Sequence, residues 1–158
     1  MKRILMTSIV NLIELEEGWR EKPYFCTEGY PTIGFGFKIG PKGAPLSNYQ
    51  FKISKAVGAV WLNELVDEFV KDMEKYQHID DALKACNDAR KAVLISMAYQ
   101  MGVDGLAAFK NTLRAVAESR WADAKAGMLN SKWAKQTPER ANRHANQMLT
   151  GEWDKVYL

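Results

Sequence analysis

Residues 88–101 restrict the fold more than any other stretch, because as a helix they would have almost no polar face. A helix that is apolar nearly all round is a buried one. Gly102 is expected to end this helix, and the shorter helical segments that follow are expected to pack around it. The apolar or small residues of the stretch are Ala89, Ala92, Val93, Leu94, Ile95, Met97, Ala98, Tyr99 and Met101.

A second long helix is predicted for residues 54–76, where apolar side chains recur at helical spacing and charged ones fall on the other side. At about 1.5 Å per residue, such a helix spans about 30 Å. It is therefore long enough to bridge two lobes. Its apolar stripe consists of Val57, Val60, Trp61, Leu62, Leu65, Val66, Phe69, Val70 and Met73.

Residues 1–16 begin with two charged side chains and an apolar run, as a secretory signal does. Asn11 interrupts this run, three glutamates follow at once, and no small-residue cleavage site appears. The segment is therefore interpreted as an amphipathic helix, capped by Thr7 or Ser8 and ending near Gly18. A cleaved or membrane-arrested N-terminus is the alternative. The inward face of the helix would hold Ile9, Leu12, Ile13 and Leu15.

Short strands are predicted on both sides of a polar turn. Residues 24–25 and 32–37 have the composition of strands, and residues 27–29 form the turn between them. Residues 38–51 contain two glycines and two prolines, which indicate an irregular connection. This connection would close a small β-containing portion of the chain.

The last clear helix is expected to begin with Thr137 as its N-cap and Pro138 as its first residue, and to end at Gly151. With 158 residues, 47% apolar and 26% charged, the chain has the composition of one soluble globular domain. The prediction is a mostly helical α+β fold. It would consist of an N-terminal helix with a small antiparallel β lobe (about 1–53), a bridging helix (about 54–76) and a helical C-terminal lobe (about 77–158).

Three polar side chains lie close together in the sequence around the predicted turn. Glu17 stands at the end of the first helix, and Cys26 and Thr32 flank the turn of the hairpin. A carboxyl that faces two further polar groups is an arrangement that can flank a bond in a substrate. The alternative is a capped helix followed by an ordinary hairpin with one surface acid, since polar groups around turns are common.

The pattern E-x8-C-x5-T, followed by I-G-F-G, resembles the signature of the phage-type lysozymes, the endolysin family of glycoside hydrolases. The likeness extends from Glu17 to Asp154 and implies the two-lobed lysozyme-like fold. Further segments that resemble the family, in the family's order, are AYQMGVDGLAAFKNTLR (98–114), SRW (119–121), SKWAKQTPERANR (131–143) and TGEWD (150–154).

The resemblance implies catalytic roles for Glu17, Cys26 and Thr32. Glu17 would be the general acid, and shelter beside aromatic rings would favour the protonated carboxyl that this role needs. Most members of the family have Asp at the position of Cys26, and a thiol with an ordinary pKa of about 8.5 is only slightly ionised at neutral pH. Cys26 would attack carbon, activate water or play a minor part; a packed, unreactive thiol is the alternative. Thr32 would hold the attacking water or a sugar hydroxyl.

Five further positions match residues that line the family's substrate cleft. The resemblance implies that Arg140 approaches Glu17 and that the other four contact substrate, whereas an exposed lysine or a core aromatic needs no such role. Two positions depart from the family: Phe37 replaces a common His, so an apolar contact is expected there, and Gly127 replaces a substrate-contacting Asn. The five implied substrate-binding residues are Lys38, Tyr99, Gln100, Thr112 and Arg140.

The function implied is that of an endolysin. It would be a muramidase that hydrolyses the β-1,4 bond between N-acetylmuramic acid and N-acetylglucosamine in peptidoglycan and so lyses a bacterial host. It would be made in the host cytoplasm and act as a monomer on the wall from the periplasm. Two other classes stay open. A lytic transglycosylase would use Glu17 but end through an internal sugar hydroxyl, and a non-catalytic wall-binding protein would retain Cys26 as a mark of lost chemistry.

Charge and composition restrict the partners. Residues 110–158 contain nine Lys or Arg against five Asp or Glu, a basic surplus that suits an anionic cell wall. Nucleic acid is not expected, because no binding motif accompanies the charge, and no run approaches the roughly 20 apolar residues of a membrane span. Cys26 and Cys86 can pair in an oxidising compartment, although a packed thiol explains Cys86 more simply. Without a His/Cys cluster, neither metal nor cofactor is expected.

Overall fold

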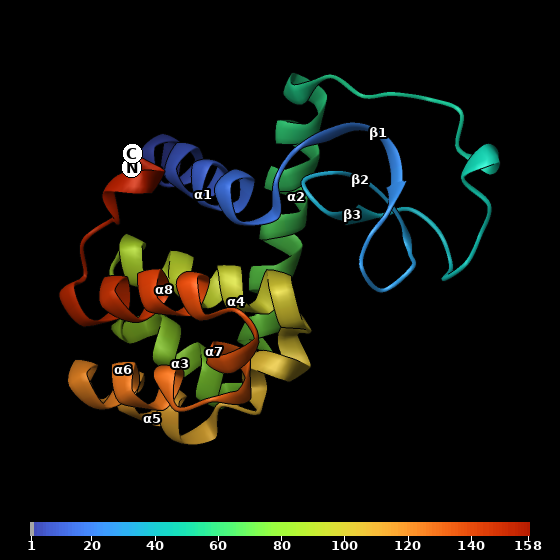
Figure 1. Cartoon of the computed structure of the whole chain (residues 1–158). Helices are drawn as coiled ribbons and strands as arrows, with labels where there is room; N and C mark the ends of the chain where they lie inside the picture. Colours follow the sequence, from blue (N-terminus) through green and yellow to red (C-terminus); the bar gives the residue numbers. More distant parts are fainter. Residues whose placement is uncertain (1) are drawn as a thin grey trace. The chain divides into compact units, whose positions relative to one another are not determined.

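The computed structural model describes residues 2–158, with side chains from Ser8 onward. It is mostly helical with one three-stranded antiparallel sheet, which confirms the predicted α+β class (Figure 1). The chain forms two compact units, Met1–Leu65 and Val66–Leu158. Helix α2 (Lys55–Glu74) matches the helix predicted for residues 54–76; it begins in the first unit and ends in the second.

Helix α1 (Lys2–Glu17) buries the predicted residues Ile9, Leu12 and Ile13. Two details of the prediction are wrong. The helix begins at Lys2, so Thr7 and Ser8 lie inside it and do not cap it, because no helix-breaking residue precedes them. Leu15 is 51% exposed, because residues two apart on a helix point to different sides and Ile13 already faces inward.

The sheet has the strand order β1-β2-β3, with β1 (Arg20–Phe25), β2 (Pro31–Gly34) and β3 (Phe37–Lys38) (Figure 1). Tyr24 pairs with Thr32, and a turn closed by the hydrogen bond from Gly29 N–H to Cys26 O (2.9 Å) joins β1 to β2. The single strand predicted for residues 32–37 is instead two strands. Gly36 has φ +79°, a left-handed conformation that reverses the chain between β2 and β3.

Four aromatic rings form a continuous cluster in the first unit. Trp19 lies 4.7 Å from Phe35, Phe35 lies 6.0 Å from Phe37, and Phe37 lies 4.5 Å from Trp61, measured between ring centroids. Phe37 is only 2% exposed. The apolar contact predicted at this position is therefore confirmed.

Gly34→Ala is expected to destabilise the protein by about 2–5 kcal/mol. A Cβ at this position would lie 2.7 Å from two ring atoms of buried Phe37, and Gly34 has φ +67°. Overpacking costs about 1–3 kcal/mol, and the left-handed backbone adds about 1–2 kcal/mol. The matched control is Gly43→Ala, since Gly43 has φ +80° but nothing within 4 Å of an added Cβ. Urea unfolding of both variants checks the prediction, which equal losses in the free energy of unfolding would contradict.

Helix α2 exposes part of its predicted apolar stripe. Leu62 and Met73 are fully buried, whereas Val57 is 53% and Val60 62% exposed. The expectation of an inward position is wrong for these two valines. Neither falls on the side of the helix that Leu62 buries, since two and five residues are not helical repeats.

The second unit is built around α4, as residues 88–101 predicted. Residues 92–98 are all buried, and Gly102, with φ +81° and ψ 160°, interrupts the helical backbone where the helix was expected to end. Helix α8 packs on α4, α6 and α7, and α5 packs on α3 and α6 (Figure 1). The helices of this unit are α3 (Gln77–Ala85), α4 (Asp88–Ala107), α5 (Lys110–Ala117), α6 (Trp121–Leu129), α7 (Lys132–Gln136) and α8 (Pro138–Thr150).

The ends of α8 follow the prediction with one exception. Pro138 occupies the first turn, and Gly151 ends the helix in the left-handed conformation with φ +73°. Thr137 precedes the helix, but its hydroxyl donates to the Trp133 carbonyl (3.0 Å) and does not cap α8. The side chain is engaged in this way because Thr137 also ends α7.

Within residues 2–158, no single helix has both the length and the hydropathy needed to cross a bilayer. Helices α4 and α5 reach that length and composition only as a pair, across a bend of 104°.

Candidate active site

The carboxyl of Glu17 lies beside the turn between β2 and β3. Glu17 is the last residue of α1 and is half-buried. Its Oε2 would be 3.5 Å from a Cβ on Gly36, an ordinary contact distance, so the carboxyl lies directly next to this glycine. The corresponding space at Gly34 is filled by the Phe37 ring.

Cys26 and Thr32 lie together in the β1–β2 hairpin. Cys26 follows the last residue of β1, and its N–H donates to Tyr30 O (3.0 Å). Thr32 on β2 is 1% exposed, and its hydroxyl donates to Tyr30 O (2.8 Å). The same hydroxyl is within hydrogen-bonding reach of the Cys26 thiol. It has one hydrogen, so a thiolate would compete with the Tyr30 carbonyl for it.

The surroundings of Cys26 favour its thiolate. Desolvation by itself raises the pKa of the thiol, but hydrogen bonds from the backbone of Tyr30 and Glu28 and from the Thr32 side chain, with the charge of Lys38, bring the pKa below its ordinary value. Hydrogen bonds to the charged form of a group stabilise that form. The sequence left open whether the thiol is ionised, and this hairpin supplies the groups that promote ionisation.

Tyr24 lies close enough to Glu17 and Cys26 for their charges to affect the pKa of its phenol. Burial raises the pKa of its phenol, the Arg20 charge lowers it, and the negative charges of Cys26 and Glu17 raise it further. The Arg20 guanidinium stacks on the Tyr24 ring at 4.7 Å from the centroid. From the sequence, Tyr24 was expected to be a strand residue and one of the aromatic rings beside Glu17. Its pairing with Thr32 across the hairpin was the signal that it belongs to this site.

Lys38 extends into solvent from β3. Its Nζ lies 3.3 Å from Glu28 Oε2 and 4.3 Å from the centroid of the Tyr30 ring. An exposed ion pair of this kind contributes little to stability. Lys38 thus belongs to the same hairpin as Cys26, and its contact with substrate remains a prediction.

Cys26 is expected to react selectively with iodoacetamide, whereas Cys86 stays protected in the folded protein. Both thiols are free, but burial raises the pKa of the Cys86 thiol to about 11. The thiolate is the reactive form, so the Cys26 rate should reach its plateau at a lower pH than that of an ordinary thiol. Peptide mass spectrometry after labelling across a pH series measures this. Equal labelling of the two cysteines in the folded protein would contradict the prediction.

Two predicted substrate contacts, Tyr99 and Gln100, are half-buried at the end of the helical part of α4. The side-chain oxygen of Gln100, Oε1, accepts a hydrogen bond from Trp133 Nε1 (2.8 Å). This bond supplies the partner that an amide in an apolar helix needs. The Tyr99 ring lies 5.5 Å from the Phe69 ring. Both side chains therefore have structural contacts in this unit, and their role in binding stays a prediction.

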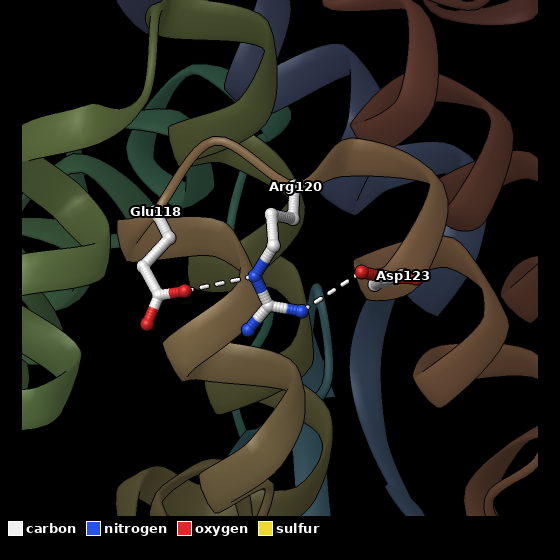
Figure 2. A network of polar contacts seen from close by, with 3 residues as sticks. All are labelled: Glu118, Arg120 and Asp123. Atoms are coloured by element: carbon white, nitrogen blue, oxygen red, sulfur yellow. Dashed lines mark hydrogen bonds and ion pairs between the residues drawn. The ribbon is translucent and has the colours of Figure 1, made fainter.

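Thr112 lines a pocket of about 310 Å³ beside α5 and α6. Its hydroxyl covers Gly127, where a Cβ could not be accommodated. On the rim, Arg120 holds Glu118 and Asp123 with two bonds of 2.8 Å (Figure 2). Arg114 also lines the pocket, so two arginines and one aspartate are among its lining residues.

Arg140 is buried in the second unit and is part of a polar network that sequence analysis did not predict. Its Nη2 donates to Ser96 Oγ (2.9 Å) and Ser96 O (3.2 Å). Ser96 Oγ lies 2.7 Å from His144 Nε2. Ser96 Oγ accepts from Arg140 and keeps both a hydrogen and a second lone pair, so the tautomer of His144 decides which of the two side chains donates in this contact. The spacing of Arg140 and His144, one helical turn, was the available signal.

Among residues 2–158, no group of three or more His, Cys, Asp or Glu side chains is placed to hold a metal ion.

A mostly helical α+β chain that places a carboxyl beside a small polar hairpin has the features of a glycoside hydrolase. Residues 14–150 match the family described as Phage lysozyme. The match covers most of the 158 residues. The chain belongs to the phage lysozyme family and is a glycoside hydrolase of the lysozyme type.

Individual relatives include both short and long proteins. Probable T4-type lysozyme 1 of Dictyostelium discoideum is 32% identical over 93% of this chain and 96% of its own length. The Pre-baseplate central spike protein Gp5 of Enterobacteria phage T4 is 32% identical over 91% of this chain, but the chain spans only 28% of it. Peptidoglycan hydrolase gp36 of Pseudomonas phage phiKMV is 30% identical over 84% of this chain and 14% of its own length.

Proposed function

We propose that this lysozyme hydrolyses the β-1,4 bond between N-acetylmuramic acid and N-acetylglucosamine in peptidoglycan, and that Glu17, Cys26 and Thr32 carry the reaction. The main support is that the charges of Glu17 and Cys26 both raise the pKa of the Tyr24 phenol. Glu17 comes from a helix end and Cys26 from the hairpin, so both segments contribute to one site. The name of the phiKMV relative, a peptidoglycan hydrolase, supports the substrate.

Glu17 is the proton donor in this proposal. Its proton passes to the glycosidic oxygen while the bond from that oxygen to the anomeric carbon breaks. The carboxyl lies next to Gly36 in the turn between β2 and β3, and a positioned general acid is worth about 10²–10⁴-fold in rate.

Cys26 supplies the negative charge on the other side of the reaction. Its thiolate either attacks the anomeric carbon and is later displaced by water, or takes a proton from the water that attacks directly. In both routes water becomes the new hydroxyl of the sugar and the leaving sugar keeps the Glu17 proton. The second proton of that water returns to the Glu17 carboxylate, directly in the first route and by way of the thiol and solvent in the second. Thr32 holds the thiolate by its hydroxyl, and the lowered pKa of Cys26 supports this role.

The biological role proposed is lysis of a bacterial host. The enzyme would be made in the host cytoplasm and act on the wall as a monomer. The basic surplus of residues 110–158 would favour its approach to an anionic wall. Lys38, Tyr99, Gln100, Thr112 and Arg140 are the proposed substrate-binding residues.

Digestion of purified peptidoglycan by the wild-type protein tests this function, with the products identified by mass. Hydrolysis is expected to give fragments that end in reducing N-acetylmuramic acid. Ends of N-acetylglucosamine would contradict the bond, anhydro ends would indicate a transglycosylase, and the absence of released fragments would indicate a wall-binding protein without turnover.

A further inference from the structure

The edge of β1 that does not pair with β2 has a pocket next to it. The strand order β1-β2-β3 leaves this edge without a neighbouring strand. The segment 46–53 runs along it and is held there by the hydrogen bond from Ile53 N–H to Glu21 O (3.0 Å). The pocket of about 440 Å³ is lined by residues of β1 and of this segment. None of the proposed catalytic residues lines it.

The floor of the pocket is apolar and partly aromatic. It is formed by Pro23 of β1 and by Leu46, Tyr49 and Phe51 of the segment. Phe51 is 47% exposed, so its ring is available to a ligand. The hydroxyl end of Tyr49 is seated against Gly40, where a Cβ would overlap it. The Tyr49 ring is thereby held in one position, which reduces the entropy that a ligand would have to remove.

Two lysines, Lys22 and Lys52, complete the lining, and both are exposed. Neither forms an ion pair with any residue from Ser8 to Leu158. Other lysines of this unit do, since Lys38 pairs with Glu28 and Lys55 with Glu14. The pocket therefore joins aromatic surface to two positive charges that no acidic side chain neutralises.

We infer that this pocket is a second binding site for the peptidoglycan strand, an inference that rests on the proposed function. The C–H face of a sugar ring packs on aromatic side chains, and the carboxylates of the lactyl groups and stem peptides would lie near Lys22 and Lys52. A strand of repeating disaccharides can offer one unit to the hairpin site and another to this pocket. Binding at the second site raises the local concentration of substrate at the first.

The test measures retention on purified peptidoglycan from which all other wall polymers have been removed. Glu17→Gln serves as the parent, so that the strand stays intact during the measurement. Adding Lys22→Glu and Lys52→Glu is expected to weaken binding about tenfold at low salt, because two attractions become repulsions, and the difference should largely disappear at about 1 M salt. Adding Phe51→Ala alone is expected to weaken binding several-fold.

Two matched controls are available. Lys71→Glu, at an exposed position of α2, makes the charge change of one of the two lysine substitutions, and Val60→Ala removes an apolar side chain that is 62% exposed. Both should bind within twofold of the parent, and thermal unfolding should show that all variants are folded. Equal binding of all variants, or an equal loss in the controls, would overturn the inference. Retention that needs phosphate-bearing wall polymers would overturn it too, as would a parent that does not bind.

The two proposals fail in different ways. If the wild-type protein releases no fragments from peptidoglycan, the proposed function is wrong. If it releases them while the lysine and Phe51 variants bind like the parent, only the second site is wrong.

Discussion

Glu17→Gln is expected to lower kcat on peptidoglycan by about 10²–10⁴-fold, the usual contribution of a positioned general acid. The amide has nearly the shape of the carboxyl and fits the space beside Gly36, but it has no proton to give to the glycosidic oxygen. Because the change removes an interaction that matters in the transition state, KM should change little. Release of soluble fragments, followed over time at several substrate concentrations, measures both constants.

A matched control for this experiment is Glu64→Gln, which neutralises an exposed glutamate on α2 in the same unit. It should keep the wild-type rate, because no part in the reaction is proposed for this side chain. Glu17→Gln should also unfold at about the wild-type urea concentration. If the variant hydrolyses peptidoglycan at the wild-type rate, Glu17 is not the acid, although the family assignment would be unaffected.

The fold was predictable from the sequence where one pattern had one physical meaning. Residues 92–98 are apolar except for Ser96 and were expected to be buried, as they are, and Gly102 interrupts the helix as expected. Boundaries were less predictable: the strand expected over residues 32–37 is divided because Gly36 adopts a left-handed backbone, which a sequence permits but does not require. Thr137 failed as a cap because α7 ends at the same residue.

The contacts of the candidate site were not predictable from the sequence, although the sequence proposed its three residues. The spacing of Glu17, Cys26 and Thr32 placed them around one hairpin, whereas the position of the carboxyl over Gly36 depends on how α1 meets the sheet. The state of Cys26 depends on backbone N–H groups of the turn, and these are present in every sequence. The network of Arg140, Ser96 and His144 joins residues 48 positions apart, which local patterns do not connect.

We expect Cys26→Ser to lose most of the activity and Cys26→Asp to keep most of it. The serine hydroxyl stays protonated at neutral pH, so the negative charge proposed at this position is lost and kcat should fall by about 10²–10³-fold. Aspartate is ionised above about pH 4 and is the residue that the resemblance to the phage-type lysozymes implies for this position. Cys26→Asp should therefore stay within about tenfold of the wild-type rate and become insensitive to iodoacetamide.

The pH dependence of the rate distinguishes a reaction that needs the Cys26 thiolate from one that does not. A reaction that needs the thiolate loses rate as pH falls through the thiol pKa, which lies below its ordinary value. In Cys26→Asp this acidic limb of kcat/KM should move to lower pH, because a carboxyl protonates later than a thiol as pH falls. An unchanged limb, or full activity of Cys26→Ser, would remove Cys26 from the mechanism. A glycosyl adduct on Cys26, trapped by acid quench and detected by mass, would identify the sulfur as the nucleophile.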